Sequence, residues 1–518
     1  MRKHLFIFLC LLLLGVAAQA QNVTITPSGI TPAQAATYQR LNYDAILALP
    51  SPAVGDMAYD LTFRCLRLYN GDKWLCSYQI PGDITPNMTA ILSAGGTSSD
   101  EGSDIAVDAS GNVYITGIYS GTAIFARGVS LTSAGGSDDI YVAKYNSSGT
   151  LQWVRSAGGT GDAYGTGIAV DASGNVYITG TYSGTDTFAS GVSLTAEGIS
   201  DVYVAKYNSS GTLLWVRSAG GTNNDYGRGI AVDASGNVYI TGYYFGTATF
   251  ASGVSLTAEG ISDVFIIKYN SSGTLQWVRS AGGTSADRGF GIALDVLGNV
   301  YATGSYSGTA IFSGVSLTSV GGSDDIYVAK YNSSGALFWV SSAGGTNNDY
   351  GRGIAVDASS NVCITGTYSG TATFAVGVSL TSVGGNDAFV ARCNSSGTLQ
   401  WVRSAGGTNN DYGRGIAVDV SGNVYATGSY SGTATFSGVS LTSADGSDDV
   451  FIAKYNSIGA LQWVRSAGGA SNDYGYGIAV DASDNVYITG TYSGTATFGG
   501  SAFTSAGSSD VFVLRLEN

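Results

Sequence analysis

Aspartates recur at fixed positions along most of this 518-residue chain and are its most numerous candidates for chemistry. Three series repeat about every 62 residues: Asp100, Asp162, Asp225, Asp287, Asp349, Asp411 and Asp473; Asp108, Asp171, Asp233, Asp295, Asp357, Asp419 and Asp481; and Asp139, Asp201, Asp263, Asp325, Asp387, Asp449 and Asp510. A catalytic carboxylate pair needs two unlike environments, whereas these residues are copied with every repeat. We expect them to accept backbone N–H bonds in turns, with calcium coordination as the alternative and no other cofactor.

Glutamates are the acidic residues that could break this symmetry, as a carboxylate-dependent glycosidase or lyase would require. The chain contains Glu101, Glu197, Glu259 and Glu517. Glu197 and Glu259 occupy equivalent positions of neighbouring repeats, which points to duplication, and no pair stands out. The one histidine, His4, lies in a segment that we expect to be removed. Ser-His-Asp hydrolysis and histidine metal sites are therefore excluded.

One position varies inside an otherwise steady frame and carries aromatic and cationic side chains. It is occupied by Ser103, Thr166, Arg228, Phe290, Arg352, Arg414 and Tyr476, and tyrosines lie nearby at Tyr226, Tyr350, Tyr412 and Tyr474. Aromatic rings and guanidinium groups suit contacts with sugars or peptides. We predict that these residues bind a ligand, and neutral drift in exposed loops is the alternative.

The elements that position these residues are short strands. Seven copies of the repeat follow one another, and the periodicity within each copy is two. In the third copy, strands are predicted at 229–233, 238–242, 264–269 and 275–279, with turns at 234–237 and 270–273. Valine, isoleucine, tyrosine and tryptophan suit half-buried strands, and glycine, asparagine and serine suit the turns. Longer, irregular loops are expected at 220–226 and 246–262.

Four antiparallel strands repeated seven times predict an all-β, seven-bladed β-propeller with four strands in each blade. The last copy stops after its third strand, whereas residues 88–96 precede the first copy and end in the Ser-Ala-Gly-Gly that closes the fourth strands. We therefore predict that 88–96 completes the last blade as a latch strand. A β-solenoid is the competing architecture, but it gives no reason for this split. The variable position and its tyrosines would then ring the channel mouth on the face of the longer loops.

The repeat resembles a known family. Residues 225–242, followed by Asp263 to Tyr269 and Leu275-Gln-Trp-Val278, are similar to the SBBP (seven-bladed beta-propeller) repeat of secreted proteins of Bacteroidetes and related bacteria. The resemblance covers about 88–518. It implies the propeller fold and secretion, and it brings no shared catalytic motif.

The first 87 residues differ in composition from the repeats. Residues 1–20 read as a secretory signal, with Arg2 and Lys3 before an apolar run and Ala18-Gln19-Ala20 at the cleavage site. Its removal would move the net charge from -14 to about -16. Residues 21–87 are proline-rich and predict a small β-rich module and linker, with a short helix within 33–49 and hairpins over 57–78. Cys65 and Cys76 flank that hairpin, and a disulfide between them or two free thiols are both open.

A second disulfide is predicted between Cys363 and Cys393. The other repeats carry tyrosine at the position of Cys363, and most carry it at the position of Cys393, so the fifth repeat departs at both positions together. The two residues lie on strands expected to be antiparallel neighbours, near the same end. Two buried free thiols are the alternative.

The sequence thus predicts a secreted, non-enzymatic β-propeller scaffold whose loop face binds a protein or carbohydrate. We expect an extracellular or cell-surface location, with the periplasm as a further option, and a monomer. The acidic balance argues against nucleic acid, and no stretch after the signal is long and apolar enough for membrane insertion. The alternative function is a polysaccharide-active enzyme.

Overall fold

The computed structural model describes residues 39–41, 57–60, 65–69, 74–77, 87–135 and 138–517. The chain divides into two compact units, residues 1–84 and 85–518. Within the described residues both are built from strands, and helical geometry is confined to two short 3-10 turns, η1 (Val320–Gly322) and η2 (Ala444–Gly446). The described part of the chain contains no helix long and apolar enough to cross a membrane.

The first unit contains a four-stranded sheet in the order β1-β2-β3-β4. Its strands are β1 (Gln39–Leu41), β2 (Met57–Asp60), β3 (Cys65–Tyr69) and β4 (Trp74–Ser77). The antiparallel pair β3–β4 confirms the predicted hairpin, whereas β1 is extended where we expected a helix, so that prediction is wrong at 39–41. The backbone register pairs Cys76 with Arg67 and Cys65 with Asp60. The two cysteine side chains lie outside the description, and their bridge stays a prediction.

The second unit repeats the four predicted strands along the chain, joined in antiparallel order. The first strands are β6 (Glu101–Val107), β12 (Ala163–Val170), β18 (Asp225–Val232), β24 (Arg288–Leu294), β30 (Tyr350–Val356), β34 (Tyr412–Val418) and β40 (Tyr474–Val480). The second strands are β7 (Val113–Tyr119), β13 (Val176–Tyr182), β19 (Val238–Tyr244), β25 (Val300–Tyr306), β31 (Val362–Ala375), β35 (Val424–Ser431) and β41 (Val486–Tyr492). The third strands are β10 (Asp139–Tyr145), β16 (Asp201–Tyr207), β22 (Asp263–Tyr269), β28 (Asp325–Tyr331), β32 (Val378–Cys393), β38 (Asp448–Tyr455) and β44 (Asp510–Glu517). The fourth strands are β11 (Leu151–Gly159), β17 (Leu213–Gly221), β23 (Leu275–Gly283), β29 (Leu337–Gly345), β33 (Leu399–Gly407) and β39 (Leu461–Gly469).

The connection between second and third strands is a hairpin, not the irregular loop that we expected. The hairpins are β8 (Thr122–Ala126) with β9 (Val129–Thr132), β14 (Thr185–Ala189) with β15 (Val192–Thr195), β20 (Thr247–Ala251) with β21 (Val254–Thr257), β26 (Thr309–Phe312) with β27 (Val315–Thr318), β36 (Thr433–Phe436) with β37 (Val439–Thr442), and β42 (Thr495–Phe498) with β43 (Ser501–Thr504). Each extends the sheet of the preceding repeat, as β14 does on β11. The sheets of the second unit therefore contain six strands rather than the predicted four, and one contains ten because β31 and β32 run on through their hairpin.

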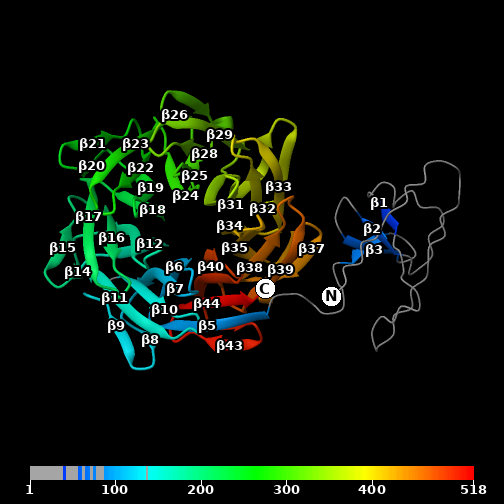
Figure 1. Ribbon diagram of the computed structural model, residues 1–518, viewed down its shortest axis with the longest axis horizontal. Coiled ribbons are helices and arrows are strands. Elements are labelled where there is room, and N and C mark those ends of the chain that lie inside the picture. Colours follow the sequence, from blue (N-terminus) through cyan, green and yellow to red (C-terminus); the bar gives the residue numbers. More distant parts are fainter. Residues whose placement is uncertain are drawn as a thin grey trace, which may run out of the picture. The chain divides into compact units, whose positions relative to one another are not determined.

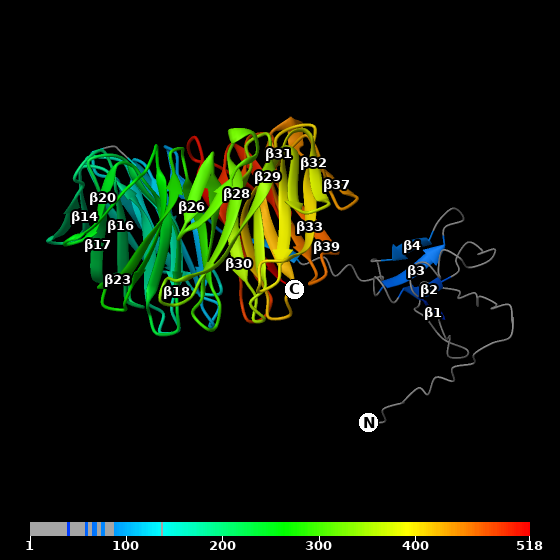
Figure 2. The same cartoon turned by 90° about the horizontal axis from the view of Figure 1, so that it is seen from above.

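The sheets of the second unit are arranged radially around a common centre, and seen edge-on their strands run between two faces (Figure 1, Figure 2). The first strands lie innermost. Each contacts the first strands of the repeats before and after it, and β40 contacts β6. The segment β5 (Asn87–Gly96) pairs antiparallel with β44, and its end pairs with β8.

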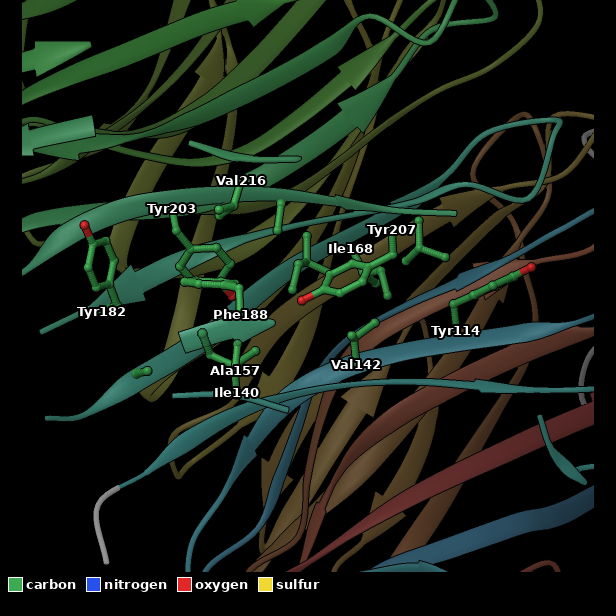
Figure 3. Packing of buried hydrophobic residues seen from close by; sticks show 14 of the residues in the cluster. Tyr114, Ile140, Val142, Ala157, Ile168, Tyr182, Phe188, Tyr203, Tyr207 and Val216 are labelled. Atoms are coloured by element: carbon green, nitrogen blue, oxygen red, sulfur yellow. The ribbon is translucent and has the colours of Figure 1, made fainter. Parts of the chain in front are cut away.

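The hydrophobic core is divided into clusters, each filling the space between neighbouring sheets. Figure 3 shows one of them, where Tyr114 and Val142 of the first repeat pack with Ile168, Phe188 and Tyr203 of the second. Second and third strands are buried on both faces, as β13 and β16 are throughout. No single repeat could bury these faces alone, which explains why the repeats occur in series.

The turns after the first strands confirm the role predicted for the second aspartate series. Asp108 accepts hydrogen bonds from the backbone N–H groups of Ser110 and Asn112 at 2.9 and 3.0 Å, from Asn112 Nδ2 at 2.8 Å and from the Tyr114 hydroxyl at 2.9 Å. Burial opposes its ionisation, but these hydrogen bonds outweigh burial and lower the pKa of Asp108. The described residues contain no group of three or more histidine, cysteine or acidic residues suited to a metal ion.

Candidate functional site: the central cavity

The first strands surround a cavity of about 250 Å³. Every residue of the variable position lines it: Ser103, Thr166, Arg228, Phe290, Arg352, Arg414 and Tyr476. The structure therefore brings together residues that lie about 370 positions apart in the sequence. It also corrects their local setting, because we expected them in loops and they lie within strands.

A β-bulge in each first strand turns the variable residue toward the cavity. In β18 the pairing with β19 shifts between Gly227 and Gly229, so Arg228 is the extra residue. A bulge re-aims one side chain without ending the strand. The flanking glycines permit it, because a Cβ at Gly229 would lie 2.9 Å from the carbonyl oxygen of Phe290 in the next repeat. Close packing of the inner strands thus fixes the frame while the bulged residue stays variable.

Aromatic rings hold the three cavity arginines. The guanidinium carbon of Arg352 lies 4.4 Å from the ring centroid of Phe290, and that of Arg414 lies 4.8 Å from Tyr476. Arg228 lies over Tyr243 at 5.6 Å and donates a hydrogen bond from Nη2 to its hydroxyl at 3.0 Å. Each arginine is half-buried. Stacking orients a guanidinium group without neutralising its charge.

The predicted tyrosines flank the arginines and do not line the cavity itself. Arg228, Arg352 and Arg414 stack on Tyr226, Tyr350 and Tyr412 of their own strands at 5.4, 5.1 and 5.7 Å respectively. Arg414 also lies over Tyr474, at 5.9 Å. The tyrosines therefore position the arginines from the side of the longer connections.

The charges in the cavity are unevenly spread. Burial, and then repulsion by Arg414 and Arg228, lowers the pKa of Arg352 to about 10. All three arginines come from the third, fifth and sixth repeats, whereas the first and second repeats contribute the small polar residues Ser103 and Thr166. One side of the cavity is thus cationic.

Two carboxylates that we did not single out as a pair, Glu101 and Asp104, belong to β6 of the first repeat. Asp104 lines the cavity and accepts hydrogen bonds from the backbone N–H groups of Ile105 and Ile168, both at 2.9 Å. Burial raises the pKa of Asp104 to about 6. Burial also raises the pKa of Glu101, which the charge of Arg414 partly offsets.

Comparison of the repeats would have revealed this pair. The other repeats have glycine where the first has Asp104, namely Gly167, Gly229, Gly291, Gly353, Gly415 and Gly477, and they have Tyr or Arg where it has Glu101. These are the departures from sevenfold symmetry that a carboxylate site requires, and one of them, Asp104, lines the cavity. By contrast, Glu197 and Glu259 lie on the hairpin connections, beside Asp201 and Asp263.

The predicted disulfide between Cys363 and Cys393 is wrong, because both thiols are free. Their strands are neighbours, but Cys363 pairs with Arg392 and Cys393 pairs with Val362. Since adjacent residues of a strand point to opposite faces, the one-residue offset places the two cysteines in different core clusters. Burial raises the pKa of both thiols, to about 12 for Cys363 and about 11 for Cys393.

Comparisons with known proteins agree with this architecture. The family model of the SBBP beta-propeller repeat matches residues 152–192, 214–243, 400–429 and 462–491. The chain is a β-propeller repeat protein. The matched segments contain several of the strands and turns described above. The match to this family does not assign an activity.

Individual relatives are distant. A WD repeat-containing protein of Acanthamoeba polyphaga mimivirus is 24% identical over 80% of this chain, and regulatory protein FlaEY of Caulobacter vibrioides is 31% identical over 21% of it. The chain spans 37% and 12% of the lengths of these two relatives. Among solved structures, YCF48 bound to D1 peptide aligns over 85% of this chain and 98% of its own, with 10% identity and a TM-score of 0.39.

Proposed function

We propose that this protein is a secreted, non-enzymatic seven-bladed β-propeller that binds a protein or carbohydrate ligand at its central cavity. The observation that carries the proposal is the bulge shared by the first strands, which turns a variable side chain of each repeat into a common cavity. A constant frame that presents variable aromatic and cationic groups suits recognition.

Ring closure by a latch strand is part of this proposal. It is supported by the contact between β40 and β6, and by the antiparallel pairing of β5 with β44. In this arrangement β5 takes the place of the fourth strand of the last repeat. Closure hides the edges that an open array of sheets would expose.

Export to the cell surface or the extracellular space is supported by the signal-like residues 1–20. Intact-mass analysis of the protein from culture medium and from cell fractions tests this step. We expect a mature chain that begins at Gln21 and is recovered outside the cytoplasm. A full-length chain retained in the cytoplasm would contradict it.

Ligand binding is tested by screening the exported protein against arrays of glycans and cell-surface proteins, with calcium and with chelator. We expect at least one ligand whose binding is lost in a variant with Arg228, Arg352 and Arg414 replaced by Gln. A ligand that binds this variant equally well would place recognition elsewhere on the molecule. The chelator arm reports separately on the calcium alternative.

A carboxylate-dependent, polysaccharide-active enzyme is the second candidate, and the pair Glu101 and Asp104 favours it. Both break the repeat symmetry, Asp104 lines the cavity, and burial raises the pKa of each. A raised pKa suits a general acid. Release of reducing ends or unsaturated products from a polysaccharide panel, abolished by Glu101→Gln and Asp104→Asn, would favour the enzyme over the scaffold.

A further inference from the structure

We propose that the central cavity binds a sugar acid, a uronic acid unit either free or at the end of a glycan chain, with its carboxylate held by Arg228, Arg352 and Arg414. The inference rests on the proposed function, because it names the ligand chemistry of the same cavity. It follows from three guanidinium groups that form no ion pair within the described residues.

The three arginines have N–H groups that form no hydrogen bond within the described residues. Among the described residues, none of them forms an ion pair, and Arg352 and Arg414 donate no hydrogen bond. The Nε atoms of Arg228 and Arg414 are buried without a partner. Ring stacking covers the faces of the guanidinium groups, and their N–H donors lie in the guanidinium plane. Such donors match the two oxygens of a carboxylate.

Without a bound anion, the positive charges of the three cavity arginines repel one another. Arg352 is desolvated and repelled by Arg414 and Arg228, and the charge of Glu101 interacts with that of Arg414. An anion that enters the cavity relieves this repulsion. The volume of about 250 Å³ admits a ligand of monosaccharide size.

The residues on the other side of the cavity suit contacts with hydroxyl groups of the same ligand. Asp104 presents carboxylate oxygens that already accept two backbone N–H bonds and retain further lone pairs, and Ser103 lies beside it. The pKa of Asp104 is raised to about 6, so its ionised form is disfavoured by burial. At pH 7 a carboxyl group with this pKa remains largely ionised and accepts hydrogen bonds from sugar hydroxyl groups, and titration with free glutamate distinguishes a sugar acid from an amino acid.

The test is calorimetric titration of the exported protein with galacturonate and glucuronate, alongside galactose, glucose and free glutamate. We expect the sugar acids to bind and to raise the melting temperature, and the neutral sugars to bind at least about tenfold more weakly. Arg352→Gln and Arg414→Gln should each weaken sugar-acid binding by about tenfold or more. Arg127→Gln is the matched control, because Arg127 is exposed in the turn of an outer hairpin and its loss changes net charge equally.

Circular dichroism and melting in buffer show whether each variant is folded. Because two arginines are replaced separately, the inference can still be tested if one of the two variants does not fold. Equal affinity for galactose and galacturonate, glutamate binding in place of the sugar acids, or unchanged binding by both Gln variants would overturn the inference. A screen ligand whose binding ignores Arg352→Gln and Arg414→Gln would overturn it while leaving a binding function intact. Absence of any ligand in both experiments would overturn both proposals.

Discussion

Individual departures from the repeat are compensated nearby, and the fifth repeat gives the clearest case. In the first repeat the Tyr114 hydroxyl donates to Asp108 Oδ2, and Lys144 lies over the Tyr114 ring at 5.1 Å. In the fifth repeat Cys363 replaces that tyrosine, and Arg392 replaces the lysine. Arg392 Nη2 then donates to Asp357 Oδ2 at 2.5 Å, so the guanidinium takes the place of the missing hydroxyl.

This exchange predicts strong coupling between positions 363 and 392. Cys363→Tyr should destabilise the protein by about 1–3 kcal/mol, because the new ring competes with Arg392 for the same space. Arg392→Lys should also destabilise it, since Asp357 loses its buried ion pair. The double variant restores the pair found in the other repeats, and its loss should be smaller than the sum by about 1 kcal/mol or more. Denaturation midpoints of the four proteins measure the coupling, and simple additivity would disprove it.

Asp186 is a departure without compensation. It is fully buried, neither of its carboxylate oxygens has a hydrogen-bond partner, and six other repeats have alanine there: Ala123, Ala248, Ala310, Ala372, Ala434 and Ala496. Burial, and then the charge of Asp139, raises the pKa of Asp186 to about 7. Asp186→Ala should therefore stabilise the protein at pH 8 by about 2 kcal/mol and by less at pH 5. Thermal melts at both pH values test this, with Asp162→Ala, at an exposed aspartate, as the control. A destabilised Asp186→Ala protein would refute the reasoning.

At the scale of elements, sequence reasoning located the strands whose side chains alternate between buried faces. The predicted strands at 238–242 and 264–269 lie within β19 and β22. The hairpin β20–β21 was missed because its Thr, Ser, Gly and Ala residues have the composition of a loop, and because its pairing partner β17 belongs to another repeat. The bulge was missed for a similar reason, since only the packing between inner strands shows why glycines flank the variable residue.

The pairing of β5 with β44 predicts the effect of a truncation. A chain that begins at Thr97 lacks β5, so β44 has an unpaired edge and the core around Val511 and Val513 loses its cover. We expect aggregation, or a stability loss of about 5 kcal/mol or more. A chain that begins at Thr85 keeps β5 and serves as the control. Equal melting of the two truncated chains would show that the pairing contributes little.

The molecule as a whole carries two populations of aspartates whose pKa values shift in opposite directions. Hydrogen bonds outweigh burial and lower the pKa of Asp108, Asp171, Asp295 and Asp481. Burial raises the pKa of aspartates that lie at the start of a first strand or just before it, to about 7 for Asp225, Asp287, Asp349, Asp411 and Asp473. It also raises the pKa of aspartates in the third strands, to about 6 for Asp201, Asp263, Asp325, Asp387 and Asp449.

These shifts predict an acidic optimum of stability. A carboxyl group with a raised pKa holds its proton longer in the folded state than in the unfolded state, so its contribution is lost as pH rises from about 4 to 7. The groups with lowered pKa contribute above about pH 4 and lose that contribution below it. Melting temperature at constant ionic strength should therefore be highest near pH 4–5, fall toward pH 7 and level off above it. A melting temperature that rises between pH 5 and 8 would contradict this balance.

The same aspartates show what a single sequence conveys and what it does not. Their sevenfold recurrence was enough to predict that the second series lies in turns, which the hydrogen bonds of Asp108 confirm. The meaning of Asp104 depended on its position, because only the inward bulge and the neighbouring strands show that this carboxylate meets Arg228, Arg352 and Arg414 in one cavity. Regular spacing in the sequence is enough to identify the repeats. A site built from residues that differ between repeats can be recognised only when the structure shows that these residues lie close together.

The contact between the two ends of the second unit also sets an order in time. A ribosome completes residues 87–96 first and reaches their partners in β44 about 420 residues later, which at ~5–20 residues per second is a delay of roughly 20–80 seconds. Throughout that interval β5 has no partner strand in β44, and the sheets that form after it belong to an array that is not yet closed. The early strand stays unpaired until β44 has been synthesised, so we expect the growing chain to expose a sheet edge that could pair with neighbouring molecules during that interval.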